Sequence, residues 1–171
     1  MINRPQPDEY PPFADRYVSL VGDGPIIKIL EDLQASTYNL LTGIDPDKAG
    51  YAYAEDKWAI KEVIGHMADT ERVFAYRALV FSREAIELPG FDQDIYMLNN
   101  TFNSRQLVDL ADEFKTVREA SLYLLKSLSE NQFKQKGIAS GSPVSVRGLA
   151  YMMAGHELHH IKVLKERYLL G

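Results

Sequence analysis

Apolar residues recur three or four positions apart in four long stretches of the chain, the spacing typical of helices that bury one face. The four predicted helices cover approximately residues 24–43, 58–82, 104–128 and 145–169. Asn103 or Ser104 is the expected cap of the third helix, and Ser145 can start the fourth. Because no pair of strands is evident, the pattern predicts an all-α four-helix bundle.

The connection between the second and third helices is long for a compact bundle. It contains the turn signal Pro89-Gly90, and the next helical pattern begins only near Ser104. A connection of this length permits a crossover, and long ordered loops often carry function. We therefore expect this segment to line a site. Residues 45–56 and the segment with Gly137, Gly141 and Pro143 are predicted to be loops.

The amino-terminal segment differs in composition from the rest. Four prolines fall within residues 1–21, and proline removes a backbone donor and fixes an extended course. We expect an extended arm over 1–21 that lies against another surface, followed by one bundle domain over 22–171.

Composition narrows the function classes. The chain has 171 residues, 46% hydrophobic and 25% charged, which suits one globular domain. It contains no Cys, so a thiolate metal site is excluded and a cytoplasmic location is favoured. No stretch approaches the roughly 20 apolar residues that cross a bilayer. A net charge of -5 argues against nucleic acid as a partner.

Three of the four histidines lie in the last predicted helix, in the string GHELHHIKVLKERY. At ~100° per residue, His156 and His160 are one turn apart on the same apolar stripe and should both point inward. Burying two imidazoles is costly unless something binds their lone pairs, and a divalent ion does so. The spacing therefore predicts a metal site.

A His pair leaves an ion short of ligands, and His66 on the second helix is the remaining histidine. A three-His site suits Zn or Ni, and also Fe, and leaves at least one position open for water or substrate. His159 lies to the side of His156, so we expect it to flank the site and support the ligands. The alternative is that His159 is itself a ligand.

The same string matches the zinc-protease motif H-E-x-x-H at His156 and His160, in which the Glu is a general base. Those proteases take a third ligand from downstream, but no His follows His160 in this sequence. The pattern also offers no sheet on which a peptide could align. We therefore set the protease interpretation aside.

The segments KWAIKEVIGHMADTERVFAYRAL, LPGFDQD and AGHELHHIKVLKERYL resemble the DinB-like superfamily of metal-binding four-helix bundles. The resemblance includes the YfiT-type branch of metal-dependent hydrolases and related thiol S-transferases. It implies the metal triad His66, His156 and His160 and a homodimer. This chain has Ala59 where the family often has Ser or Thr after the Trp, so the usual helix cap is missing.

The leading hypothesis is a metal-dependent enzyme that activates water or a low-molecular-weight thiol, as a hydrolase or a thiol S-transferase acting on a small molecule. The rival is a non-catalytic, metal-stabilised dimeric module for binding or stress response. Several acidic residues are candidates for orienting a ligand imidazole or accepting a proton, namely Asp69, Glu71, Glu157, Asp92 and Asp94. Arg72 and Arg77, and the loop residue Asp92, are candidates for substrate binding, with exposed helix cations as the alternative for the two arginines.

Overall fold

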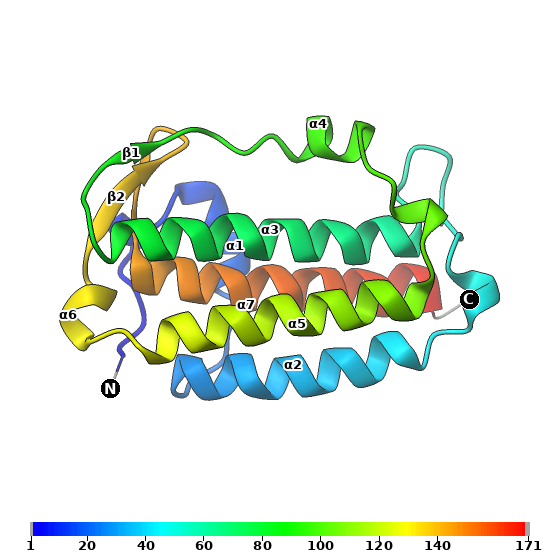
Figure 1. Cartoon of the computed structure of the whole chain (residues 1–171), viewed down its shortest axis with the longest axis horizontal. Coiled ribbons are helices and arrows are strands. Elements are labelled where there is room, and N and C mark those ends of the chain that lie inside the picture. Colours follow the sequence, from blue (N-terminus) through cyan, green and yellow to red (C-terminus); the bar gives the residue numbers. More distant parts are fainter. Residues whose placement is uncertain (1, 170–171) are drawn as a thin grey trace.

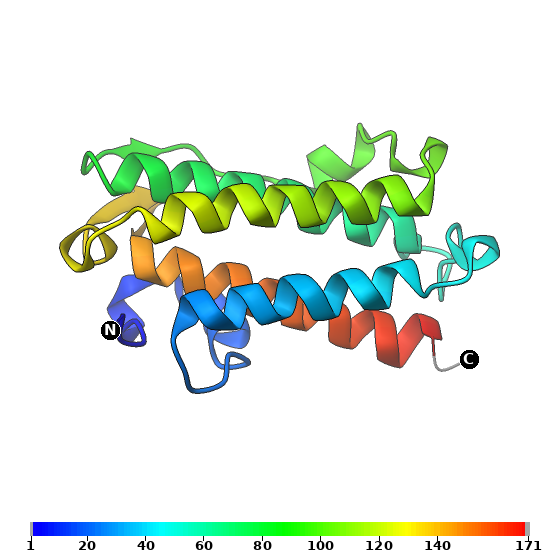
Figure 2. The same cartoon turned by 60° about the horizontal axis from the view of Figure 1, so that its bottom comes forward.

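The computed structural model describes residues 2–169 and contains the four predicted long helices. They are α2 (Ile26–Thr42), α3 (Ile60–Phe81), α5 (Leu107–Lys126) and α7 (Val146–Val163). Figure 1 shows α2 and α7 running in one direction and α3 and α5 in the other. In the turned view, α5 lies beside α3 and α2 lies beside α7 (Figure 2). The predicted four-helix bundle is confirmed.

The direction of α5 follows from the long connection after α3. This segment contains β1 (Glu87–Leu88), α4 (Gln93–Leu98) and a 3₁₀ turn (Phe102–Ser104), and it runs back along α3 (Figure 1). It returns the chain to the end of the bundle where α3 began. As a result α3 and α5 are parallel neighbours, and the predicted crossover is confirmed.

Two helix starts depart from expectation. The cap predicted at Asn103 or Ser104 is wrong, because residues 102–104 form a separate 3₁₀ turn and the N-cap of α5 is Gln106. At the start of α3, Ala59 has no capping side chain, but its backbone N–H donates to the Glu62 carboxylate over 2.8 Å. One half of a capping box thus compensates for the missing Ser or Thr.

The expectation of no strands is also wrong. β2 (Lys136–Ala139) and β3 (Ser142–Ser145) form an antiparallel hairpin, and β1 pairs parallel to β2. The hairpin turn has φ 54° at Ser140 and 73° at Gly141, the left-handed conformation that two-residue hairpin turns require. The strands of the hairpin have only four residues each, too few to show a clear alternation of apolar and polar residues in the sequence. Part of their pairing also comes from β1 in the distant α3–α5 connection, so the sequence did not reveal them.

The arm is less extended than predicted. After two 3₁₀ turns (Pro7–Glu9 and Pro12–Ala14) it forms a short helix, α1 (Asp15–Val18), which packs against α7. The contact is close, since a Cβ on Gly155 would lie 2.1 Å from the Tyr17 carbonyl oxygen. Because the arm covers a second side of α7, nearly every residue from Val146 to Glu157 is buried.

Two apolar clusters fill the ends of the bundle, and a buried polar layer separates them. Along α3, for example, the cluster residues Ala68 and Phe74 flank the polar pair Thr70 and Glu71. The buried polar side chains of this region are Thr37, His66, Thr70, Glu71, Arg118, Ser121, His156 and Glu157. Since buried polar groups require partners, this layer is the place in the fold where chemistry is expected.

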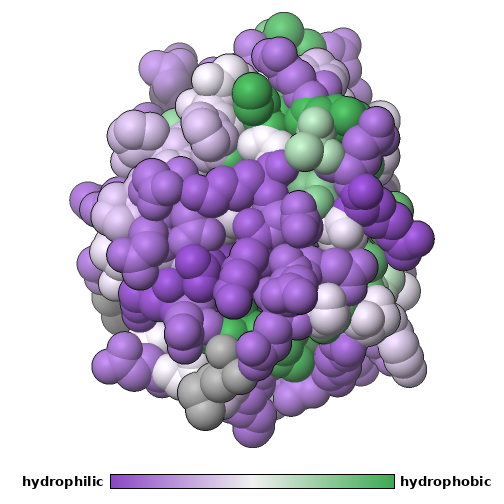
Figure 3. Space-filling model, turned by 90° about the vertical axis from the view of Figure 1, so that its left-hand side faces the viewer, coloured by the Kyte–Doolittle hydropathy of each residue, from purple (hydrophilic) through white to green (hydrophobic). Residues whose placement is uncertain are grey.

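The outer surface is mainly polar where it can be viewed at the end of the bundle formed by α6 (Glu130–Phe133) and the sheet (Figure 3). Within residues 2–169, no helix combines the length and apolar character needed to cross a membrane.

Candidate metal centre

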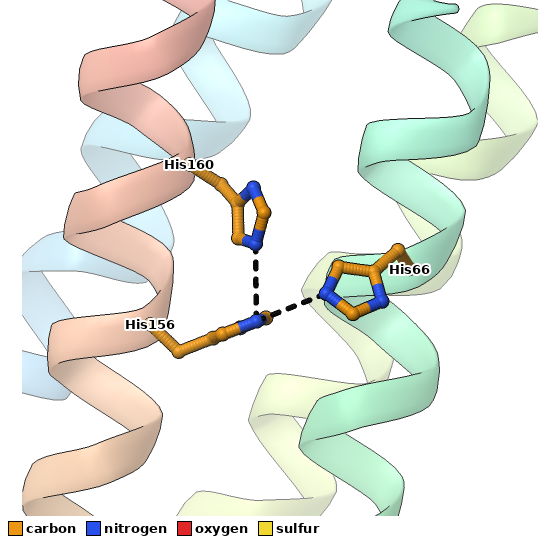
Figure 4. A group of neighbouring side chains, drawn as sticks. All are labelled: His66, His156 and His160. Atoms are coloured by element: carbon orange, nitrogen blue, oxygen red, sulfur yellow. Dashed lines mark hydrogen bonds between the residues drawn. The ribbon is translucent and has the colours of Figure 1, made fainter. Parts of the chain in front are cut away.

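Three imidazole rings converge in the polar layer, one from α3 and two from α7 (Figure 4). Nε2 of His156 lies 3.1 Å from Nε2 of His66 and 3.1 Å from Nε2 of His160. One nitrogen from each ring falls within 4.8 Å of the others, a spacing that fits a single ion. In the described part of the chain, no carboxylate joins this group.

Burial keeps these imidazoles neutral. It lowers the pKa of His66 to about 4, with a further contribution from His159. Burial and the neighbouring histidines lower the pKa values of His156 and His160 well below the ordinary value. Neutral imidazole is the form that coordinates a metal ion, so the triad is ready to bind at neutral pH.

The donor set itself fits a cation. Each neutral ring carries one proton, so the three facing nitrogens cannot all be satisfied by hydrogen bonds to one another. A divalent ion would accept a lone pair from each of them. His66, His156 and His160 are therefore the residues able to hold a metal.

The surrounding side chains restrict the rings. Thr70 Oγ1 lies 3.5 Å from Nδ1 of His66, and the Trp58 ring lies 4.8 Å from the His66 ring, centroid to centroid. On the other side, the Tyr17 ring of the arm meets the His156 ring edge-on at 5.4 Å. These contacts limit rotation of the imidazoles and thereby help to keep Nε2 inward.

Sequence comparison assigns the chain to a family. Residues 29–164 match the DinB superfamily. The chain belongs to the DinB superfamily. Among curated proteins, no sequence matches it.

Solved structures share the fold of this DinB-superfamily protein. YfiT from Bacillus subtilis, described as a probable metal-dependent hydrolase with an unusual four-helix bundle topology, superposes with a TM-score of 0.75 at 15% identity, covering 89% of this chain and 95% of YfiT. The DinB-like protein YjoA from Bacillus subtilis has a TM-score of 0.58 at 24% identity, covering 82% of this chain and 86% of YjoA. At these identities the likeness establishes the fold alone.

His159 lies at the flank of the triad. Its ring centroid is 5.0 Å from that of His160 and 5.4 Å from that of Tyr17, and the side chain is half-buried. It is outside the group of converging nitrogens. The position matches a flanking residue better than a ligand.

The carboxylates predicted to orient an imidazole have other partners. Glu157 lies beside His156 in sequence, but its Oε2 is 2.6 Å from Nη1 of Arg118, and Glu71 also pairs with Arg118. The Glu157 carboxylate is therefore paired with Arg118 instead of with a ligand imidazole, in contrast to its predicted supporting role. Burial raises the pKa of the Glu157 carboxyl, and the attraction of Arg118 only partly opposes this.

Asp69 and Arg72 face the outside of α3. Arg72 donates to Glu113 over 2.6 Å and to Asp69 over 3.3 Å. These contacts account for both side chains, and among the described residues neither Asp69 nor Arg72 hydrogen-bonds to the triad. The roles predicted for them at the site are not supported by their positions.

Asp92 and Asp94 belong to the start of α4. The Asp92 carboxylate accepts hydrogen bonds from the backbone N–H groups of Asp94 and Ile95, so Asp92 is the N-cap of this helix. Asp94 is exposed. The Asp92 carboxylate therefore stabilises the start of α4, and its predicted role in substrate binding is not supported by this position.

Arg77 is not an exposed helix cation. Its side chain is 7% exposed, and its Nη2 donates to the Pro89 carbonyl oxygen over 3.0 Å. Arg77 and His156 line the same cavity, together with Phe91 and Gln93 from the long connection. This connection thus lines the site region, as its length predicted.

Sequence reasoning did not single out Arg118 or Tyr17. Arg118 carried a signal, because it continues the apolar stripe of Leu110, Phe114 and Ser121 at helical spacing. A charge on such a stripe points to a buried partner. Tyr17 gave no comparable signal, since its contact with His156 depends on where the arm packs.

Proposed function

We propose that this protein is a metal-dependent enzyme in which a divalent ion held by His66, His156 and His160 activates water or a low-molecular-weight thiol. The reaction is hydrolysis or thiol S-transfer on a small molecule. The observation that carries the proposal is the convergence of three Nε2 atoms from two helices, two of them on the buried residues His66 and His156 and the third on the half-buried His160.

Three neutral imidazoles favour Zn or Ni, with Fe as a further choice. When bound, such an ion acidifies a coordinated water or thiol and so supplies a nucleophile at neutral pH. The histidines hold the ion and add no charge of their own, which leaves its positive charge available. His156 also lines a cavity, so one side of the triad faces space that a small substrate can enter.

The chain has no Cys, so a thiol nucleophile must come from a cofactor or co-substrate. The absence of Cys also agrees with the proposed cytoplasmic location. The description of YfiT as a probable metal-dependent hydrolase supports the hydrolytic form of the proposal.

The test separates the two reactions. Metal-loaded protein is screened with monochlorobimane and several cellular thiols, and in parallel with ester and amide substrates. We expect turnover in one set, abolished by chelation and by His160→Ala. Equal turnover in the variant or after chelation would show that the reaction does not use the site.

The competing function is a non-catalytic module in which the ion only stabilises a dimer or a binding surface. A structural zinc site is closed by four protein ligands, whereas a catalytic site keeps a position open. Within residues 2–169 the cluster contains three ligand residues, which favours the open site. An ion found with a fourth protein ligand in a crystal of the loaded protein would favour the module.

A further inference from the structure

A cavity of about 120 Å³ adjoins the triad at His156. Its walls come from the arm, α3, the long connection, the hairpin turn and α7. Most of the wall is apolar, including Phe74, Leu149 and Met152. The exposed lining residues Phe13, Arg16 and Gln93 mark the side where the cavity meets solvent. Among the described residues, no Asp or Glu lines it.

Arg77 is the buried charge of this cavity. Besides the Pro89 carbonyl, its Nη2 has Ser140 Oγ within 3.5 Å, and both are neutral groups. Burial lowers the pKa of Arg77 and no neighbouring carboxylate opposes the effect. A guanidinium nevertheless stays protonated in proteins, so a charge is buried without a counter-charge among the described residues.

The other buried arginine shows what is missing. Arg118, with 0% of its side chain exposed, is paired with Glu71 and Glu157. Arg72, on the outside of α3, is paired with Glu113 and Asp69. Arg77 differs from both, because its environment provides hydrogen-bond acceptors but no negative charge.

A second unpaired cation stands at the mouth of the cavity. The Arg16 guanidinium lies over the Tyr17 ring, 4.6 Å from its centroid, and donates to the Tyr17 hydroxyl over 2.7 Å. No ion pair is formed by Arg16 within the described chain. The cavity therefore combines two guanidinium groups with an apolar wall, and this combination is complementary to an amphipathic anion.

The length of the cavity follows from α3. Thr70, beside the triad, and Arg77 both line it, and seven residues of helix separate them by about 10 Å. A molecule bound at Arg77 can therefore extend its other end toward His156.

We propose that this cavity binds a carboxylate-bearing small molecule, with the carboxylate on Arg77, Arg16 assisting at the mouth, and the apolar body against Phe74, Leu149 and Met152. Arg77 is buried, whereas Arg16 is exposed to solvent at the mouth, so one buried charge needs a counter-charge. The single charge of a carboxylate matches it better than the larger charge of a phosphate monoester. The assignment of this molecule as the substrate rests on the proposed function, whereas its binding does not.

The experiment measures binding of benzoate to the full-length protein by calorimetry, beside the neutral isostere benzamide and the phosphate analogue phenyl phosphate. We expect benzoate to bind at least tenfold more tightly than either. Arg77→Met should weaken benzoate at least tenfold, and the matched control Arg72→Met should leave it unchanged. Equal affinity in folded Arg77→Met, or a preference for phenyl phosphate, overturns the proposal.

Two further measurements keep the result independent of folding and of the metal. In the unaltered protein, the NMR resonance of the Arg77 Nε–H should shift on titration with benzoate while that of Arg72 stays in place; no shift at Arg77 overturns the proposal. The His160→Ala variant should still bind benzoate. Loss of binding there would mean that the ion, and not Arg77, holds the carboxylate. Because these readouts do not involve turnover, a failure of the proposed enzymatic function would be seen separately.

Discussion

Arg118 and Glu71 form a bidentate ion pair at the centre of the bundle. Nε of Arg118 is 2.7 Å from Oε1 of Glu71, and Nη2 is 2.9 Å from Oε2. The third nitrogen of the same guanidinium, Nη1, pairs with Glu157 on α7. One side chain of α5 thus connects the two helices, α3 and α7, that carry the histidine triad.

This pairing predicts that Arg118→Met destabilises the protein by about 3–5 kcal/mol at neutral pH, because two buried carboxylates lose their counter-charge. The measurement is urea unfolding followed by circular dichroism. The decrease in the free energy of unfolding caused by Arg118→Met should become smaller as the pH falls, since protonation of Glu71 and Glu157 removes the buried negative charge. In the triple variant Glu71→Gln, Arg118→Met, Glu157→Gln most of the stability should return. A cost below about 1 kcal/mol for Arg118→Met would contradict the pairing.

The metal site predicts about one divalent ion per chain in the purified protein, measured by elemental analysis with a protein assay. His66→Ala, His156→Ala and His160→Ala should each lose the ion, since removal of one of three ligands leaves too few. His159→Ala is the matched control, because its ring lies outside the converging group, and it should keep the ion. Full occupancy in the first three variants with loss in His159→Ala would show that the ligands are assigned wrongly.

Acid should destabilise the metal-free protein. The folded pKa of His66 is lowered from 6.5 to about 4, so within this window the unfolded chain binds a proton that the folded one excludes. Stability is therefore complete above about pH 6.5 and is lost as the pH falls, by about 3 kcal/mol from His66 alone. The measurement is urea unfolding of chelator-treated protein between about pH 7.5 and pH 4.5, a range that covers histidine titration. It gives the slope of the free energy of unfolding against pH. His66→Gln should make the slope smaller, with the rest due to His156 and His160, whose pKa values are also lowered. A slope unchanged by that substitution would rule out the contribution of His66.

The contact between the arm and α7 predicts that Gly155→Ala is destabilising. An added Cβ would lie 2.1 Å from the Tyr17 carbonyl oxygen, and backbone atoms cannot yield as a flexible side chain can. Overpacking of this kind costs about 1–3 kcal/mol, even though alanine favours a helix. Gly50→Ala is the control, since no atom beyond Gly50 and its two chain neighbours lies within 4 Å of its added Cβ. Urea unfolding and limited proteolysis of the arm measure the two effects; equal stability of the two variants would be unexpected.

The resemblance to the superfamily predicts a homodimer. The arm offers little apolar surface for such a contact, since Tyr10 and Tyr17 are only 7% and 8% exposed because they pack within their own chain. Phe13, at 58%, remains on the surface. Light scattering at high protein concentration should give twice the mass of the chain, and a strictly monomeric mass would count against the prediction.

The sequence by itself determined the four long helices and the inward direction of His156 and His160, because helical periodicity relates residues only three or four positions apart. His66 could be named as their partner because it is the one remaining histidine, and the family resemblance implies the same triad. A crossover could also be anticipated, since the connection between the second and third helices is too long for a tight turn.

Only the tertiary structure decided which side chains meet across the helices. Arg118, Glu71 and Glu157 lie on three different elements, and nothing in the local pattern of each could assign their partners. The same holds for the hairpin at Ser140, which depends on pairing with β1, and for Arg77, whose burial arises from the connection folding back over α3. These features depend on contacts between residues distant in the chain, and local periodicity does not encode them.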